Sequence, residues 1–217
     1  SIYTENGKSE IGLWDGLTLE ESHRHHSHLG GICPFSTIDP DGSAWKEIIE
    51  NSRTRWTSLG MGQWTGWCLP WASMIHTRFG NGDMAELILE IWKSAFTNDA
   101  GASLHDARYR GFTVFAQLDR GDIMQMDGAM GAVTAVQDML LHVRGETLFP
   151  FAGIPSRWKQ ASFEKMPAPG GFVIDGECRK GKGCVIRVRA TRNAALSLFL
   201  PGSGSWDCDG QPVSEKI

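Results

Sequence analysis

The densest group of chemically capable side chains is the run HRHHSHL at residues 23–29. Its imidazoles and guanidinium offer several directional hydrogen bonds, suited to fixing sugar hydroxyls or to holding a carboxylate ionised. A zinc site would need three or four converging ligands, and one short segment supplies only two of them. In the alternative, structural interpretation the histidines are buried and satisfied by backbone groups. The candidate ligand-binding residues are His23, Arg24, His25 and His28.

A second candidate is Asp127, which shortly precedes a stretch with the apolar spacing of a helix at residues 129–143. The positive end of a helix dipole favours an ionised carboxylate, which is the state that a general base needs. An aspartate in this place can equally cap the helix. From the residues alone, both interpretations of Asp127 stay open.

Tryptophan is the unusual feature of the composition. The chain has nine tryptophans, and six of them precede residue 72. Large amphipathic rings can wall a carbohydrate pocket, but they also fill hydrophobic cores. Trp64 and Trp67 are the candidate pocket residues of this group.

Charge and hydropathy narrow the class of partner. The 217 residues carry a net charge of -4 and supply no basic field for phosphates, which argues against a nucleic-acid partner. No apolar run approaches the roughly 20 residues of a membrane span, so no membrane partner is expected. Gly60–Gly66 resembles a dinucleotide fingerprint, but its third glycine is one place late, and we expect no cofactor.

Two further features concern the ends and the thiols. The chain begins with Ser1 rather than Met, so we expect a fragment or a processed chain. The five cysteines form no C-x-x-C pair, and their odd number leaves at least one thiol unpaired within the chain. Cys178 and Cys184 flank an expected hairpin turn, where they would be cross-strand neighbours.

Apolar periodicity predicts helices in the first two thirds of the chain. They cover residues 44–58, 66–79, a segment starting at Asp83 and residues 129–143. In the last of these helices, the spacing predicts an inward face formed by Ala132, Val133, Val136, Leu140 and Val143. Asp83 and Glu86 have the spacing of a capping box. The intervening residues 97–127 have no sustained period and predict a long loop, in which His105 and Asp106 are adjacent.

Short alternating segments follow at residues 171–179, 184–190 and 195–200, the first two around a glycine-rich turn. They predict an antiparallel β module after the helices. The sequence therefore predicts an α+β chain with a boundary near 148–160, divided as 1–148 and 149–217.

Several motifs spaced along the chain resemble those of glycoside hydrolase family 95, the α-L-fucosidase-like enzymes. Residues 14–34 contain the histidine run and a following proline, and are similar to the family's His-Arg-His-x-Ser-His-Leu segment. Residues 65–71 (TGWCLPW) resemble its Thr-Gly-Trp-Ser-x-x-Trp pattern, followed by Gly-Asp at 82–83. Residues 125–128 (QMDG) resemble its Gln-Ile-Asp-Gly. Two later segments, IPSRW at 154–158 and GGF at 170–172, continue the resemblance in the same order.

The resemblance implies that residues up to about 148 form the second part of an (α/α)6 barrel, and that the rest is a β appendage. It implies an inverting glycosidase acting on α-L-fucosides or related α-L-galactosides, with Asp127 as base and the histidine cluster and Arg24 lining the sugar pocket. The acidic Glu is expected in the missing N-terminal part of the same protein. A bacterial, periplasmic or secreted protein is also implied.

Two positions depart from the family pattern, since Ala129 and Met130 replace its Asn and Phe. Other functions also remain open from the sequence. One is a non-catalytic carbohydrate-binding or structural domain with a tryptophan platform, and another is a metal-dependent enzyme using the histidines. Because a partial barrel would leave apolar helix faces uncovered, we expect the isolated chain to self-associate.

Overall fold

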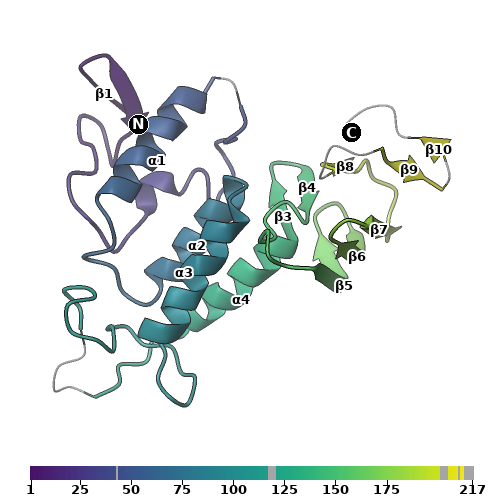
Figure 1. The fold of residues 1–217 in the computed structure, drawn as a ribbon. Coiled ribbons are helices and arrows are strands. Elements are labelled where there is room, and N and C mark those ends of the chain that lie inside the picture. The colour runs from purple at the N-terminus through teal and green to yellow at the C-terminus, as the bar shows by residue number, and fades with distance from the viewer. Residues whose placement is uncertain (43, 117–120, 201–204, 210, 213–217) are drawn as a thin grey trace.

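The computed structural model describes residues 1–42, 44–116, 121–200, 205–209 and 211–212 (Figure 1). The chain is α+β, as predicted. Among the described residues, no helix is long and apolar enough to cross a membrane. The α-helices described are α1 (Lys46–Ser58), α2 (Cys68–Arg78), α3 (Gly82–Ala95) and α4 (Met126–Leu140).

Helix α2 is the centre of the helical part, because it packs against both α3 and α4 (Figure 1). Helix α1 packs instead on the N-terminal hairpin of β1 (Ile2–Glu5) and β2 (Lys8–Ile11). A large apolar cluster, built from α1, α2, α3 and the loops around them, fills the space between these elements. A short 3-10 turn, η1 (Ser27–Leu29), ends the histidine run against this cluster.

The start of α3 differs from the prediction. Its N-cap is Asn81, whose side chain accepts a hydrogen bond from the backbone N–H of Met84 at 3.1 Å. Asp83 lies inside the first turn, and its carboxylate accepts from the backbone N–H of Ser156. The capping-box prediction for Asp83 and Glu86 is therefore wrong, because Asn81 occupies the cap and Glu86 bonds to Arg157 and Trp158.

Both ends of α4 also differ from the predicted range of 129–143. The helix begins at Met126, so Asp127 lies within its first turn rather than before it. It ends at Leu140, because the next residues form β3 (Leu141–Arg144), which pairs with β4 (Thr147–Pro150) across a turn at Gly145. The predicted boundary between 148 and 149 falls inside β4, and the strands that follow α4 begin at Leu141.

The buried face of α4 was predicted only in part. Ala132 is buried as expected, but Val133 and Val136 face outward. Small residues form the contact with α2, and a Cβ added at Gly131 would lie only 3.1 Å from the Cβ of Pro70. Such close packing turns the larger side chains away from α2. The buried residues of the helix are Gly128, Ala132, Ala135 and Met139.

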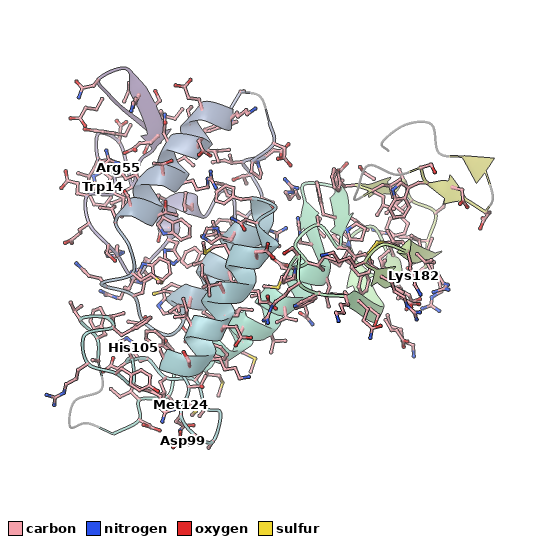
Figure 2. The ribbon with its side chains drawn as sticks, in the orientation of Figure 1. Trp14, Arg55, Asp99, His105, Met124 and Lys182 are labelled. Atoms are coloured by element: carbon pink, nitrogen blue, oxygen red, sulfur yellow. A yellow bond between two sulfur atoms is a disulfide. The ribbon has the colours of Figure 1, made fainter. Side chains whose placement is uncertain are left out.

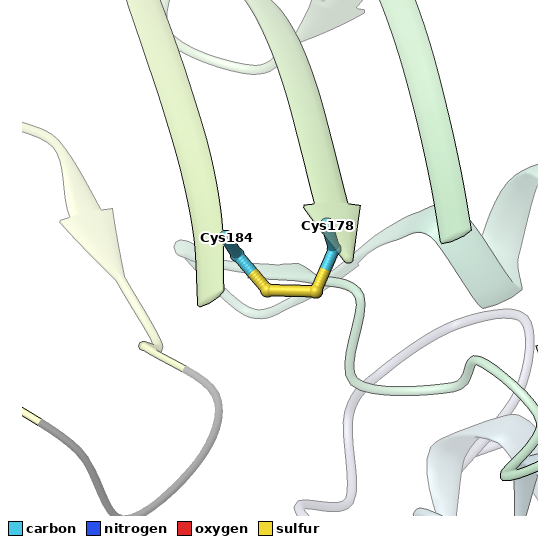
Figure 3. Close-up of a disulfide and its surroundings, with 2 residues drawn as sticks. All are labelled: Cys178 and Cys184. Atoms are coloured by element: carbon cyan, nitrogen blue, oxygen red, sulfur yellow. A yellow bond between two sulfur atoms is a disulfide. The ribbon is translucent and has the colours of Figure 1, made fainter. Parts of the chain in front are cut away.

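The segments predicted at 171–179 and 184–190 form β6 (Phe172–Arg179) and β7 (Gly183–Ala190). A further strand that was not predicted, β5 (Gln160–Ala168), joins them in an antiparallel sheet. Cys178 and Cys184 face each other across β6 and β7 and form a disulfide (Figure 3). Of the segment expected at 195–200, Ser197–Leu198 forms β8, which pairs in parallel with β4. Two short strands, β9 (Asp207–Cys208) and β10 (Gln211–Pro212), pair near the C-terminus. A second apolar cluster packs within the β module.

Helix α4 presents a stripe of exposed apolar side chains on its outer surface. Met130 is 61% exposed and Val133 is 58% exposed, on a face that also includes Met126 and Val136. We expect the chain to self-associate through this face, because contiguous exposed apolar surface favours association. Replacing Met130 and Val133 with lysine should shift the sedimentation velocity profile toward monomer.

The matched control replaces Thr54 and Thr57 with lysine, since both residues are exposed on α1 and the added charge is equal. This control should leave the sedimentation profile of the original chain unchanged. A clean monomer of the original chain at high concentration would contradict the expectation.

Candidate active site

His26 anchors the histidine run to the core. Its side chain is fully buried, its Nδ1 accepts a hydrogen bond from Trp56 Nε1 at 3.2 Å, and its Nε2 lies 3.1 Å from the carbonyl oxygen of Cys68. Only the neutral ring with its proton on Nε2 satisfies both bonds. Burial is the main cause that lowers the pKa of His26 to about 3, so the ring stays neutral near neutral pH.

The other residues of the run occupy different environments. His28 is only 7% exposed, and burial lowers its pKa to about 4. Arg24 is exposed, and its backbone carbonyl accepts from the Cys68 thiol. His23 Nδ1 accepts from the backbone N–H of His25 at 3.0 Å. The structural interpretation of the run therefore holds for His26, whereas His28 lies in the core with no hydrogen-bond partner for its Nδ1 among the described residues.

A cavity of about 410 Å³ connects the end of the histidine run with the start of α4. Asp127 lies on one side of it, and the rings of Trp67 and Trp71, 5.2 Å apart, form an aromatic wall. Ser27 contributes the hydroxyl of the histidine run. Segments far apart in the sequence thus meet around one hollow. The complete lining is Ser27, Gly30, Pro34, Phe35, Trp67, Trp71, Met74, Asp127 and Gly131.

Of the predicted site residues, Asp127 and Trp67 line this cavity. His25 is outside the lining, but its ring packs edge-on against the lining residue Trp67, with centroids 5.3 Å apart. Trp64 was predicted as a pocket residue but lies in the core, where it is 4% exposed and packs against Trp56 and His26. His28 is likewise in the core rather than on the wall. His23, Arg24, Ala129 and Met130 also stand outside the lining of this cavity.

Sequence reasoning missed the contribution of Phe35. This ring is 74% exposed and forms part of the cavity lining, although no periodic pattern surrounds it. Trp71 was detectable, because it stands four residues after Trp67 on the same helical face. The signal for Phe35 was weaker, consisting only of its position beside Pro34, the proline of the family motif.

Asp127 is an exposed carboxylate in the first turn of α4. Its Oδ1 accepts from the backbone N–H of Gly128 at 3.0 Å, and the N-cap position belongs to Gln125. Asp127 is therefore not the N-cap residue, since it stands two residues beyond the cap. The unpaired N–H groups of a first turn stabilise a negative charge there. A solvent-accessible carboxylate in this setting is able to accept a proton from water.

The other candidate reactive residues lie outside the lining of this cavity. In the described part of the chain, no three His, Cys, Asp or Glu side chains converge where they could hold a metal ion. His105 and Asp106 form a hydrogen-bonded pair in the loop after α3. Figure 2 shows His105 with Asp99 and Met124 at one end of the helical part. None of these residues contributes to the lining of the cavity around Asp127.

Comparison with known proteins identifies the family of this chain. A model of the glycosyl hydrolase family 95 catalytic domain matches residues 14–140, more than half of the chain. The matched region contains the histidine run, the aromatic wall and Asp127. The chain is therefore part of a glycoside hydrolase catalytic domain. It belongs to glycoside hydrolase family 95, which confirms the resemblance found in its motifs.

A curated relative supports the same assignment. The chain is 24% identical over 164 residues to alpha-L-fucosidase 2 of Arabidopsis thaliana. The aligned region covers 75% of this chain and 18% of that protein. The chain thus spans about a fifth of the length of the relative it matches.

The buried histidines predict that the fold is sensitive to acid. His26 has a folded-state pKa of about 3, below its unfolded value near 6.5, so the unfolded state binds more protons in between. Stability is therefore full above about pH 6.5 and falls as the pH drops. At pH 5 the loss from His26 alone is on the order of 2 kcal/mol. Burial also lowers the pKa values of His28, His76 and His142.

Asp138 acts in the opposite direction, since burial raises its pKa to about 6 although Arg78 lies 2.8 Å away and lowers it. The stability that Asp138 contributes is present at low pH and is lost as the pH rises through about 6. The four buried histidines together change the stability by more than this one carboxyl group. Urea unfolding at pH 7.5 and pH 5.0 should show a lower midpoint at pH 5.0. His26→Gln should reduce this pH dependence, and equal dependence in both proteins would refute the assignment.

Proposed function

We propose that this chain supplies the general base and an aromatic wall of an inverting glycosidase acting on α-L-fucosides or related α-L-galactosides. The observation that carries the proposal is that Asp127 and the Trp67–Trp71 wall line one cavity. Family membership supports the reaction class. The name of the plant relative, an alpha-L-fucosidase, supports the sugar.

Asp127 acts as the base in this proposal. In an inverting mechanism one carboxylic acid protonates the leaving oxygen, while a carboxylate on the opposite face removes a proton from the attacking water. The two groups stand roughly 6.5–9.5 Å apart to leave room for that water. Asp127 takes the second role, since its exposed carboxylate lines the cavity.

The aromatic wall supplies binding. The rings of Trp67 and Trp71 offer apolar faces against which the C–H groups of a sugar can pack. Ser27 adds a hydroxyl able to donate or accept a hydrogen bond at the same cavity. His25 supports Trp67 through the edge-on contact between their rings. Exposed Arg24 and half-buried His23 neighbour this segment and are proposed to contact more distant parts of a glycan.

The missing N-terminal part of the same protein is the proposed partner, and it supplies the acidic Glu. In this arrangement the helical part of residues 1–148 completes an (α/α)6 barrel. The exposed stripe on α4, centred on Met130 and Val133, suits such a partner because it is apolar and unpaired within the described residues. The isolated chain would then bind sugar weakly and catalyse no hydrolysis.

A periplasmic or secreted location is also proposed. The Cys178–Cys184 disulfide supports it, because disulfides persist in oxidising compartments.

The decisive test of the proposed function uses the full-length protein. It should hydrolyse an aryl α-L-fucoside or α-L-galactoside with inversion at the anomeric carbon, observed by NMR of the first product. Asp127→Asn should lower kcat by roughly 10²- to 10⁴-fold, because the base is lost while the size of the side chain is kept.

The control is Asp99→Asn, since Asp99 is an exposed carboxylate paired with Arg108 and outside the cavity lining. It should retain full activity. If the original protein hydrolyses neither sugar and both variants bind fucose equally, the chain is instead a non-catalytic carbohydrate-binding domain. Activity unchanged by Asp127→Asn would remove the base from the proposal.

A further inference from the structure

Gln125 joins three parts of the chain at the edge of the cavity. Its side-chain Oε1 accepts a hydrogen bond from the backbone N–H of Trp67 at 2.8 Å, across 58 residues of sequence. Its own backbone N–H donates to the carbonyl oxygen of Ser103 at 2.8 Å. Gln125 therefore ties the start of α2, the loop after α3 and the start of α4 to one another.

Two glycines allow these parts to come together. A Cβ added at Gly66 would lie 1.8 Å from the carbonyl oxygen of Leu104 and 3.0 Å from Gln125 Oε1. At Gly128 an added Cβ would lie 2.6 Å from Ser103 Oγ. Because side chains are excluded at both places, the backbone segments are in direct contact. The Gln125 bond is thus made inside a tightly packed junction, which we call the α2–α4 junction.

The hydrogen bond between Gln125 and Trp67 lies next to two residues that line the cavity. Trp67, which donates the bond, carries one ring of the aromatic wall. Asp127 follows Gln125 by two residues and lines the same cavity. The bond between Gln125 and Trp67 therefore sets the spacing between the binding surface and the reactive carboxylate.

We propose that Gln125 is a positioning residue of this active site, whose amide oxygen holds the Trp67 wall at a fixed place relative to Asp127. A sugar packed on Trp67 then presents its anomeric carbon to the water that Asp127 activates. This inference rests on the proposed function. Gln125 acts through the positions of Trp67 and Asp127. These positions matter because misplacement of reacting groups by about 1 Å can lower the rate by roughly 100-fold.

The test compares two substitutions in the full-length protein. Gln125→Met keeps the length of the side chain but removes the acceptor, and should lower kcat by roughly 10- to 100-fold with a smaller change in KM. Gln125→Glu keeps an acceptor oxygen and should restore most of kcat at its own pH optimum. Its acidic limb should lie at higher pH, because a second carboxylate near Asp127 disfavours the charged base.

The matched control is Gln160→Met, since Gln160 is an exposed glutamine in β5, outside the cavity lining. It should leave kcat, KM and the pH profile unchanged. If Gln125→Met retains the original kcat, or if Gln125→Glu is as impaired as Gln125→Met, the positioning role is overturned.

Hydrogen exchange of the Trp67 amide in this chain separates the inference from the proposed function. Gln125→Met should speed exchange at Trp67 by at least roughly tenfold, which corresponds to loss of one hydrogen bond of about 1.4 kcal/mol. Unchanged exchange would show that the bond is absent and would overturn the inference. Faster exchange in a full-length protein that hydrolyses no glycoside would instead mean that the junction exists but the proposed function has failed, and the catalytic positioning role with it.

Discussion

The structure depends on the contacts of a single buried imidazole. His26 accepts a hydrogen bond from Trp56 in α1 and bonds to the carbonyl oxygen of Cys68 at the start of α2. Its ring also contacts Trp64 and Trp71, so the two helices and the histidine run share one aromatic core. Only a neutral imidazole satisfies both hydrogen bonds. Without it, the buried indole N–H of Trp56 would lose its partner, at a cost of about 1–3 kcal/mol.

From this anchor the remaining geometry follows in steps. His26 holds the segment that ends in Ser27, and α2 carries Trp67 and Trp71 from the same core to the cavity. At the other side, small residues let α4 approach α2 closely, and Gly131 lies against Pro70. Asp127 reaches the cavity because its helix begins at the α2–α4 junction. The histidine run is therefore mainly a scaffold for the cavity, and its neighbours provide the surface that a ligand would touch.

Regular patterns in the sequence predicted much of the fold. The apolar periods located four helices, and the glycine-rich turn predicted the β6–β7 hairpin and the facing of Cys178 and Cys184. The boundaries of α4 were displaced because β3 competes for the residues after Leu140 through pairing with β4. Val133 and Val136 were assigned to the wrong face, since close helix packing selected the small residues instead.

By itself, the sequence determined the family and the identity of the reactive carboxylate candidate, because both are carried by residue types in a fixed order. It did not decide which histidines are buried, that Trp64 is in the core or that Phe35 lines the cavity. Those outcomes depend on contacts between distant segments, such as Trp56 with His26 across 30 residues and Trp67 with Gln125 across 58. Local spacing carries no information about such contacts, so only the tertiary structure could place each side chain in the core or at the cavity.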